Sequence, residues 1–164
     1  MAVLLSAPVR AEPDPGGVAS AWRWPRRWAD QEQLLERQHD GLETLLAELL
    51  RLHGPAHPAW SAAEALAFER VCRRLIWDLR LHLRLEERWL AAQGCLCPGH
   101  RGVHRQAISD AQAALLRTVC DRQARLRWLL ELQGWFSNHR HGPDATAYAI
   151  ARSNASSQSV APTR

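Results

Sequence analysis

Histidines and carboxylates recur in this sequence at spacings that suit metal ligands. His82 stands four residues before Glu86, and His100 stands four residues before His104. Residues four apart on a helix share one face, with Cβ atoms about 5–6 Å apart, so each pair could chelate one ion. The complete candidate set is His39, His82, Glu86, His100, His104, His139 and Asp144.

A metal centre is the economical explanation if these side chains converge in a helical core. Buried imidazoles and carboxylates need partners, because a buried polar group without one is costly. Five imidazoles with carboxylate oxygens suit iron better than calcium, magnesium or a thiolate zinc site. The three motifs are H-x3-E, H-x3-H and H-x4-D. Each motif alone is common, but all three in this order are expected in about one sequence in a hundred of this composition.

Each motif also has an ordinary structural interpretation. His39 alone would be a satisfied core histidine, and His82 with Glu86 could be an exposed pair on a charged helix face. Asp144 follows His139 by five residues, which is about 140° around a straight helix. It could instead cap a last helical turn.

A zinc site is a second alternative for part of the set. Cys95 and Cys97 stand just before His100 and His104, and two thiols with two imidazoles form a common tetrahedral zinc site. The spacing of the two cysteines is tighter than in typical zinc ribbons. The remaining cysteines are expected to be buried thiols rather than disulfides.

Four apolar patterns with helical spacing would position these residues. They predict helices over about residues 30–53, 61–93, 98–119 and 121–141. Ser61 with Glu64 forms a capping box at the start of the second helix, and Gly142 with Pro143 is expected to interrupt the fourth. Short connections favour antiparallel neighbours, so we expect an all-α, up-down-up-down four-helix bundle.

Length and composition limit the remaining possibilities. The 164 residues fit one domain, which we place at residues 28–152, between an irregular arm (1–27) and a disordered tail (153–164). All 21 basic residues are arginine, and the net charge of +4 is dispersed, so we expect no nucleic-acid partner. No apolar run could span a membrane, and residues 1–11 lack the basic start of a signal peptide, so we expect a cytoplasmic protein. The tryptophan-rich arm could bind a protein partner.

The order of these motifs resembles the hemerythrin family. The matching segments are QHD (38–40), HLRLEE (82–87), HRGVH (100–104) and WFSNHRHGPD (135–144), and the resemblance covers about residues 28–150. It implies a four-helix bundle around two non-haem iron ions (Fe2+/Fe3+) with an oxo or hydroxo bridge. The implied activity is reversible binding of dioxygen.

The resemblance also implies a role for each candidate ligand. One iron would be bound by His100, His104 and His139. The other would be bound by His39 and His82, which leaves it an open coordination position. Both would be bridged by Glu86 and Asp144.

Three further residues are expected to line the ligand pocket, namely Trp135, Phe136 and Arg140. The family usually has leucine where this chain has Phe136 and an aliphatic residue where it has Arg140. The guanidinium could enter the pocket and hasten loss of the bound ligand, or it could turn to solvent. We therefore expect a dioxygen carrier, scavenger or sensor. The alternatives are an enzyme that reduces peroxide, dioxygen or nitric oxide, and a zinc-binding or structural bundle.

Overall fold

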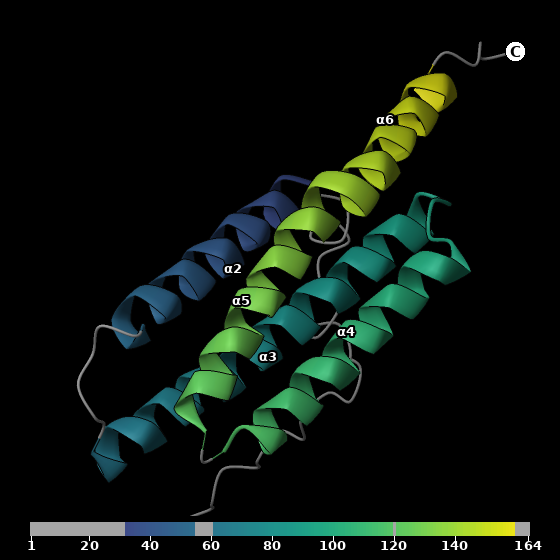
Figure 1. Cartoon of the computed structure of the whole chain (residues 1–164). Coiled ribbons are helices and arrows are strands. Elements are labelled where there is room, and N and C mark those ends of the chain that lie inside the picture. The colour runs from purple at the N-terminus through teal and green to yellow at the C-terminus, as the bar shows by residue number, and fades with distance from the viewer. Residues whose placement is uncertain (1–31, 55–60, 120, 160–164) are drawn as a thin grey trace, which may run out of the picture.

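The computed structural model describes residues 32–54, 61–119 and 121–159, and its regular elements over these ranges are all helical. Four long helices were predicted and are confirmed, with a π-helical turn and a further helix after the fourth (Figure 1). In chain order the elements are α2 (Glu32–His53), α3 (Ala62–Ala92), α4 (Pro98–Arg117), α5 (Arg122–His139), η1 (Arg140–Asp144) and α6 (Ala145–Ser159).

Local groups set where α3 and α5 begin and where α3 ends. The capping box at the start of α3 is present, because the Ser61 hydroxyl accepts from the Glu64 amide and the Glu64 carboxylate accepts from the Ser61 amide. Asp121 caps α5 by accepting from the Ala124 amide. At the other end of α3, Gly94 adopts a φ of 69°, a left-handed conformation that favours glycine and ends the helix.

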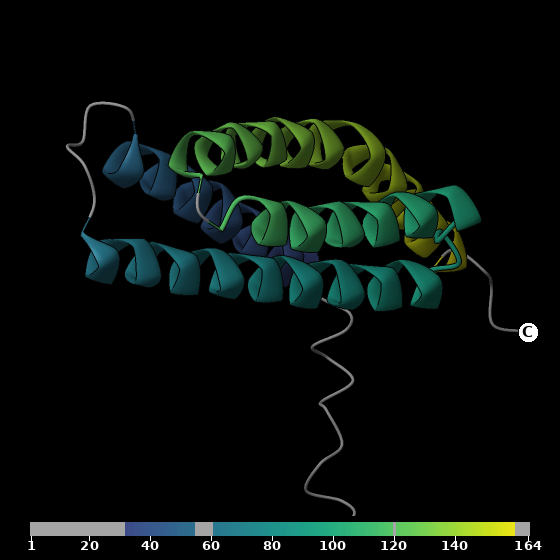
Figure 2. The same cartoon turned by 60° about the horizontal axis from the view of Figure 1, so that its bottom comes forward.

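The long helices lie lengthwise beside one another, as Figures 1 and 2 both show. Helix α2 contacts α3 and α5, α4 contacts α3 and α5, and α6 contacts α3. The larger apolar cluster includes Leu42 of α2 and Leu79 of α3, and the smaller one includes Leu35 and Trp89 of the same two helices. The predicted ligands on these two helices, His39, His82 and Glu86, are buried as well, so they lie inside the bundle.

The predicted disordered tail is corrected in part. Helix α6 extends to Ser159, although the sequence was expected to lose order from Ser153. Residues 145–159 contain neither glycine nor proline, so nothing in them stops a helix. The arm over residues 1–27 and the end over 160–164 lie outside the described residues. Among the helices described, none has the length and apolar character needed to cross a membrane.

Candidate metal centre

All seven predicted ligands are buried inside the bundle, and the most exposed of them, His100, is only 8 % exposed. They form two groups of side chains, and the donor atoms within each group lie within 4.8 Å of one another. The three-histidine group is Glu86, His100, His104, His139 and Asp144. The two-histidine group is His39, His82 and Glu86.

Ring nitrogens converge in the three-histidine group. Nε2 of His104 lies 2.8 Å from Nε2 of His139. Oδ1 of Asp144 lies 3.0 Å from Nε2 of His139 and 3.1 Å from Nε2 of His100. Lone pairs that point at one small volume suit the coordination of a cation.

Asp144 also faces the two-histidine group with its second oxygen. Oδ2 lies 3.3 Å from Nε2 of His39, whose ring centroid is 4.4 Å from that of His82. Glu86 belongs to both groups, and its Oε2 lies 3.5 Å from Nε2 of His104. The two groups therefore share two carboxylates, which is the arrangement needed to bridge a pair of ions.

The π-helical turn η1 explains how Asp144 reaches His139. A π-helix is built on contacts between residues five apart, so it brings positions i and i+5 to one face where an α-helix would separate them. Gly142 and Pro143, which were expected to interrupt the helix, lie inside this turn, and the chain continues directly into α6. The five-residue spacing is thus compatible with two ligands for one ion.

The outer nitrogens of three ligand histidines face polar side chains. Nδ1 of His82 lies 3.2 Å from the Gln38 amide oxygen, and Nδ1 of His104 lies 3.2 Å from Oε1 of Glu87. Nδ1 of His39 lies 3.5 Å from Oε2 of Glu36. Such contacts orient an imidazole and leave its other nitrogen for the metal. Sequence reasoning missed these residues, although Gln38 and Glu87 stand directly beside predicted ligands.

Several buried donor and acceptor atoms at the centre have no hydrogen-bond partner. They are Nε2 of His39, His82 and His100, and both carboxylate oxygens of Glu86 and Asp144. Nδ1 of His39 also has no hydrogen bond, since its 3.5 Å contact with Glu36 is a charge contact only. Buried polar atoms are almost always satisfied in folded proteins, so this concentration at one place calls for a ligand. Metal cations would satisfy the carboxylate oxygens and the acceptor nitrogens together. The residues present therefore fit a metal centre.

Burial also sets the protonation of the centre. It raises the pKa of Glu86 to about 9, with the Asp144 carboxylate adding to the effect. It lowers the pKa of His82 and that of His104 to about 3, helped by neighbouring imidazoles. For Asp144 burial acts in the opposite direction, but contacts from His100, His139 and His39 hold its pKa well below the usual range. Neutral imidazoles are the form that binds metal ions.

Aromatic side chains enclose the two groups. Phe136 is buried, with its ring 5.7 Å from that of His39 and 6.0 Å from that of His82. Trp135 stacks on His139 at 5.0 Å and 15°. The buried hydroxyl of Tyr148, which sequence reasoning missed, lies close enough to Glu86 for the carboxylate charge to raise the phenol pKa further above the level that burial sets. Two of the three predicted pocket residues thus contact predicted ligands.

The third predicted pocket residue, Arg140, lies elsewhere, and its assignment to the ligand pocket is corrected. Its guanidinium donates to carboxylates of Glu36 (2.9 Å), Asp40 (2.7 Å) and Glu43 (2.8 Å) on α2. These acids stand at positions i, i+4 and i+7, so they share one face of the helix. A charged group is more stable among three carboxylates near solvent than in a buried cluster.

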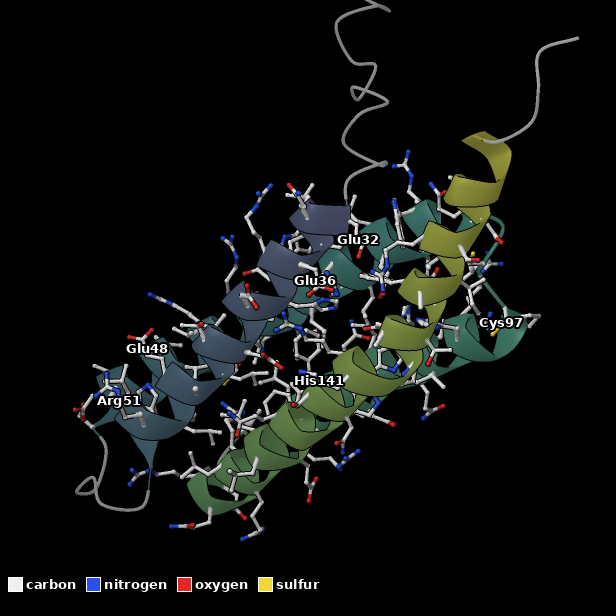
Figure 3. All side chains as sticks on the ribbon, turned by 90° about the horizontal axis from the view of Figure 1, so that it is seen from above. Glu32, Glu36, Glu48, Arg51, Cys97 and His141 are labelled. Carbon is white, nitrogen blue, oxygen red and sulfur yellow. The ribbon has the colours of Figure 1, made fainter. Side chains whose placement is uncertain are left out.

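The two thiols near the start of α4 do not join the cluster. The exposed Cys97, labelled in Figure 3 at the end of the molecule where α4 begins, accepts a hydrogen bond from the His100 amide. Cys95 donates to the backbone oxygen of Gln93. Because the imidazoles of His100 and His104 turn into the core, the alternative zinc site with two thiols is not formed.

The chain thus has the features of an all-helical protein with a buried histidine and carboxylate cluster suited to metal ions. Comparisons with protein-family models, with curated proteins and with solved structures gave no match to it. Its function is therefore argued from its own geometry.

Proposed function

We propose that this chain is a hemerythrin-like, non-haem di-iron protein whose function is to bind dioxygen. The observation that carries the proposal is the position of Asp144, whose two oxygens face histidines of the two groups at 3.0–3.3 Å. One carboxylate between two sets of imidazoles suits two ions rather than one. The all-helical core and the H-x4-D spacing support the same assignment.

The proposal includes an up-down-up-down order of the four long helices. In Figures 1 and 2, α2 ends and α3 begins at one end of the bundle, whereas α3 ends and α4 begins at the opposite end. Helices α4 and α5 meet again at the first end. This alternation supports antiparallel neighbours.

The donor atoms divide unequally between the two proposed irons. One iron would be held by His100, His104 and His139, and the other by His39 and His82, with Glu86 and Asp144 shared. The second ion would have one protein ligand fewer, which would leave room for an external ligand. A pair of non-haem irons would supply the electrons for reversible binding of dioxygen.

The surroundings of the two-histidine group favour binding over turnover. Phe136 is 1 % exposed and places an apolar ring beside His39 and His82. Arg140 brings no charge or proton donor into this space, because its guanidinium is directed to α2. An apolar ring beside these ligands suits a small neutral gas.

The proposal is tested by metal analysis combined with a visible spectrum. We expect about two irons per chain and a charge-transfer band when the reduced protein meets air. His139→Ala should remove this band, whereas His141→Ala should not, because His141 is exposed on the same turn and binds the Ser137 backbone oxygen. One zinc and no iron after growth with ample iron would contradict the proposal. Steady consumption of peroxide, dioxygen or nitric oxide would point to an enzyme instead.

A further inference from the structure

A groove runs along the outside of the bundle between α3 and α4. Its first section, of about 430 Å³, is lined by Trp77 and Leu116 among others. Its second section, of about 250 Å³, is lined by Arg84 and Arg105. Arg80 lines both sections, so they adjoin at this side chain, and we treat them as one groove. The groove has an apolar end and a cationic end.

The apolar end presents large side chains to solvent. Trp77 is 60 % exposed and Leu116 is 66 % exposed, while the buried Ile76 and Leu115 lie beside them in the groove. Exposed apolar side chains that gather in a concave site mark a place for a ligand or partner. An indole presents a flat face on which another planar ring can stack.

The cationic end holds three guanidinium groups that are free of ion pairs. Arg80, Arg84 and Arg105 make no ion pair with any residue in the part of the chain that the structure describes. The acid beside them, Glu87, lies 3.2 Å from Nδ1 of His104 and is occupied there. Unpaired guanidinium groups bind phosphate and carboxylate through paired hydrogen bonds.

The register of α3 aligns the two ends of the groove. Trp77, Arg80 and Arg84 stand at positions i, i+3 and i+7, so they share one face of the helix. Trp77 and Arg84 are two turns apart, about 10 Å along the axis. A ligand lying along α3 would meet the indole first and the guanidinium groups next.

The neighbouring groove between α2 and α3 provides a contrast. It has a volume of about 320 Å³, it reaches His82, and its arginine, Arg74, is paired with Asp78 at 2.8 Å. The two grooves therefore differ in charge. The positive charge of the α3/α4 groove is not a general property of the arginine-rich surface.

We propose that the α3/α4 groove binds a small anionic compound with a planar aromatic ring, of the nucleotide or flavin class. The ring stacks on Trp77, and the phosphate lies between Arg84 and Arg105. The volume is that of a small-molecule site, and like charges oppose a second copy of this chain at the same face. The groove also reaches His104, so the ligand lies beside the proposed metal centre. Binding itself does not depend on iron.

Titration of the full-length protein with flavin mononucleotide tests the proposal, with riboflavin as the uncharged control. We expect stacking on Trp77 to quench the flavin fluorescence, and riboflavin to bind at least about tenfold more weakly because it lacks the phosphate. Trp77→Leu should abolish the quenching; since Trp77 is largely exposed, the fold should be retained. The iron content of the same samples is measured, so a failure of the di-iron proposal can be told apart from a failure of flavin binding.

Two double variants with the same change in net charge distinguish the effect of the groove arginines on binding from the effect of net charge. Arg84→Glu with Arg105→Glu should weaken binding of flavin mononucleotide at least about tenfold. Arg37→Glu with Arg127→Glu makes the same change in charge at exposed positions on α2 and α5 and should have little effect. Equal losses in both double variants, equal binding of riboflavin, or no binding at millimolar flavin would overturn the proposal. Tighter binding of a short oligothymidine would assign the groove to nucleic acid instead.

Discussion

Arg140 and Glu36 connect the π-helical turn to helix α2 beside the candidate metal centre. Nη2 of Arg140 lies 2.9 Å from Oε2 of Glu36, and the same oxygen lies 3.5 Å from Nδ1 of His39. Figure 3 shows Glu36 on α2. Because Arg140 immediately follows His139, one ion pair links segments that supply ligands to both groups. Arg140 is therefore a positioning residue for the proposed centre.

Arg140→Met should weaken metal binding without leaving a cavity in the hydrophobic core. Loss of the guanidinium frees Glu36 to move away from His39, and removal of such an outer partner typically costs about 10–100-fold in metal affinity. Competition with a chelator measures this affinity. The control is Arg152→Met, which removes a different ion pair to α2, with Glu32, away from the ligands. Equal losses in the two variants would show that Arg140 acts only on stability.

The pH dependence of the metal-free protein follows from the shifted pKa values. Burial raises the pKa of Glu86 to about 9. Between about pH 4.5 and pH 9 the folded state keeps a proton on Glu86 that the unfolded chain has lost. The contribution of Glu86 to the free energy of unfolding is therefore full below pH 4.5 and falls as the pH rises to 9. The pKa values of His82 and His104 are lowered from 6.5 to about 3, so these groups have the opposite effect. Their contribution to the free energy of unfolding rises with pH up to 6.5.

These opposing effects place the highest melting temperature of the chelator-treated protein near pH 6.5. Above that pH, iron should remove the decline due to Glu86, because a cation holds the carboxylate charged in the folded state. Thermal melting from pH 5 to 9, with and without iron, measures the difference. An unchanged melting temperature of the metal-free protein between pH 6.5 and 9 would show that Glu86 is not buried in protonated form.

The two thiols provide a test against a zinc site. Cys97→Ala should lower the free energy of unfolding by about 1 kcal/mol, because the Cys97 thiol caps α4 by accepting from the His100 amide. Cys97→Ser should restore most of this loss. Metal content should be unchanged in both variants and in Cys95→Ser. A fall in bound metal in any of them would make the thiol a ligand.

The elements of this fold were predictable where the controlling signals are local. The capping box at Ser61 and the cap at Asp121 depend on residues within three positions, so the helix starts were predicted closely. The spacing of apolar residues was less decisive. Leu116 and Leu130 are apolar residues of the third and fourth predicted helices, but they are 66 % and 56 % exposed. A helix in a bundle buries only part of such a stripe, and the pattern alone does not say which part.

The candidate site shows the same division between local and distant causes. His82 and Glu86 share a helix face by spacing alone, so their pairing was predictable. The position of Arg140 depends on three carboxylates about 100 residues away in the sequence, and no local pattern reveals them. The π-helical turn was also missed. The five-residue spacing of His139 and Asp144 was its signal, but Gly142 and Pro143 were expected to interrupt the helix there.

The last prediction uses the unequal division of ligands between the two groups. His82→Ala removes one of only two imidazoles in the two-histidine group, so the protein should keep about one iron per chain in the three-histidine group. Asp144→Asn should reduce both irons, because Asp144 faces His39 with one oxygen and His100 and His139 with the other. Asparagine has nearly the same size, so its effect reports the lost charge rather than a cavity. Elemental analysis with Mössbauer spectroscopy counts the irons and separates their environments. Two irons retained in Asp144→Asn would mean that Asp144 does not bridge, and equal loss in both variants would mean that the two groups bind metal only together.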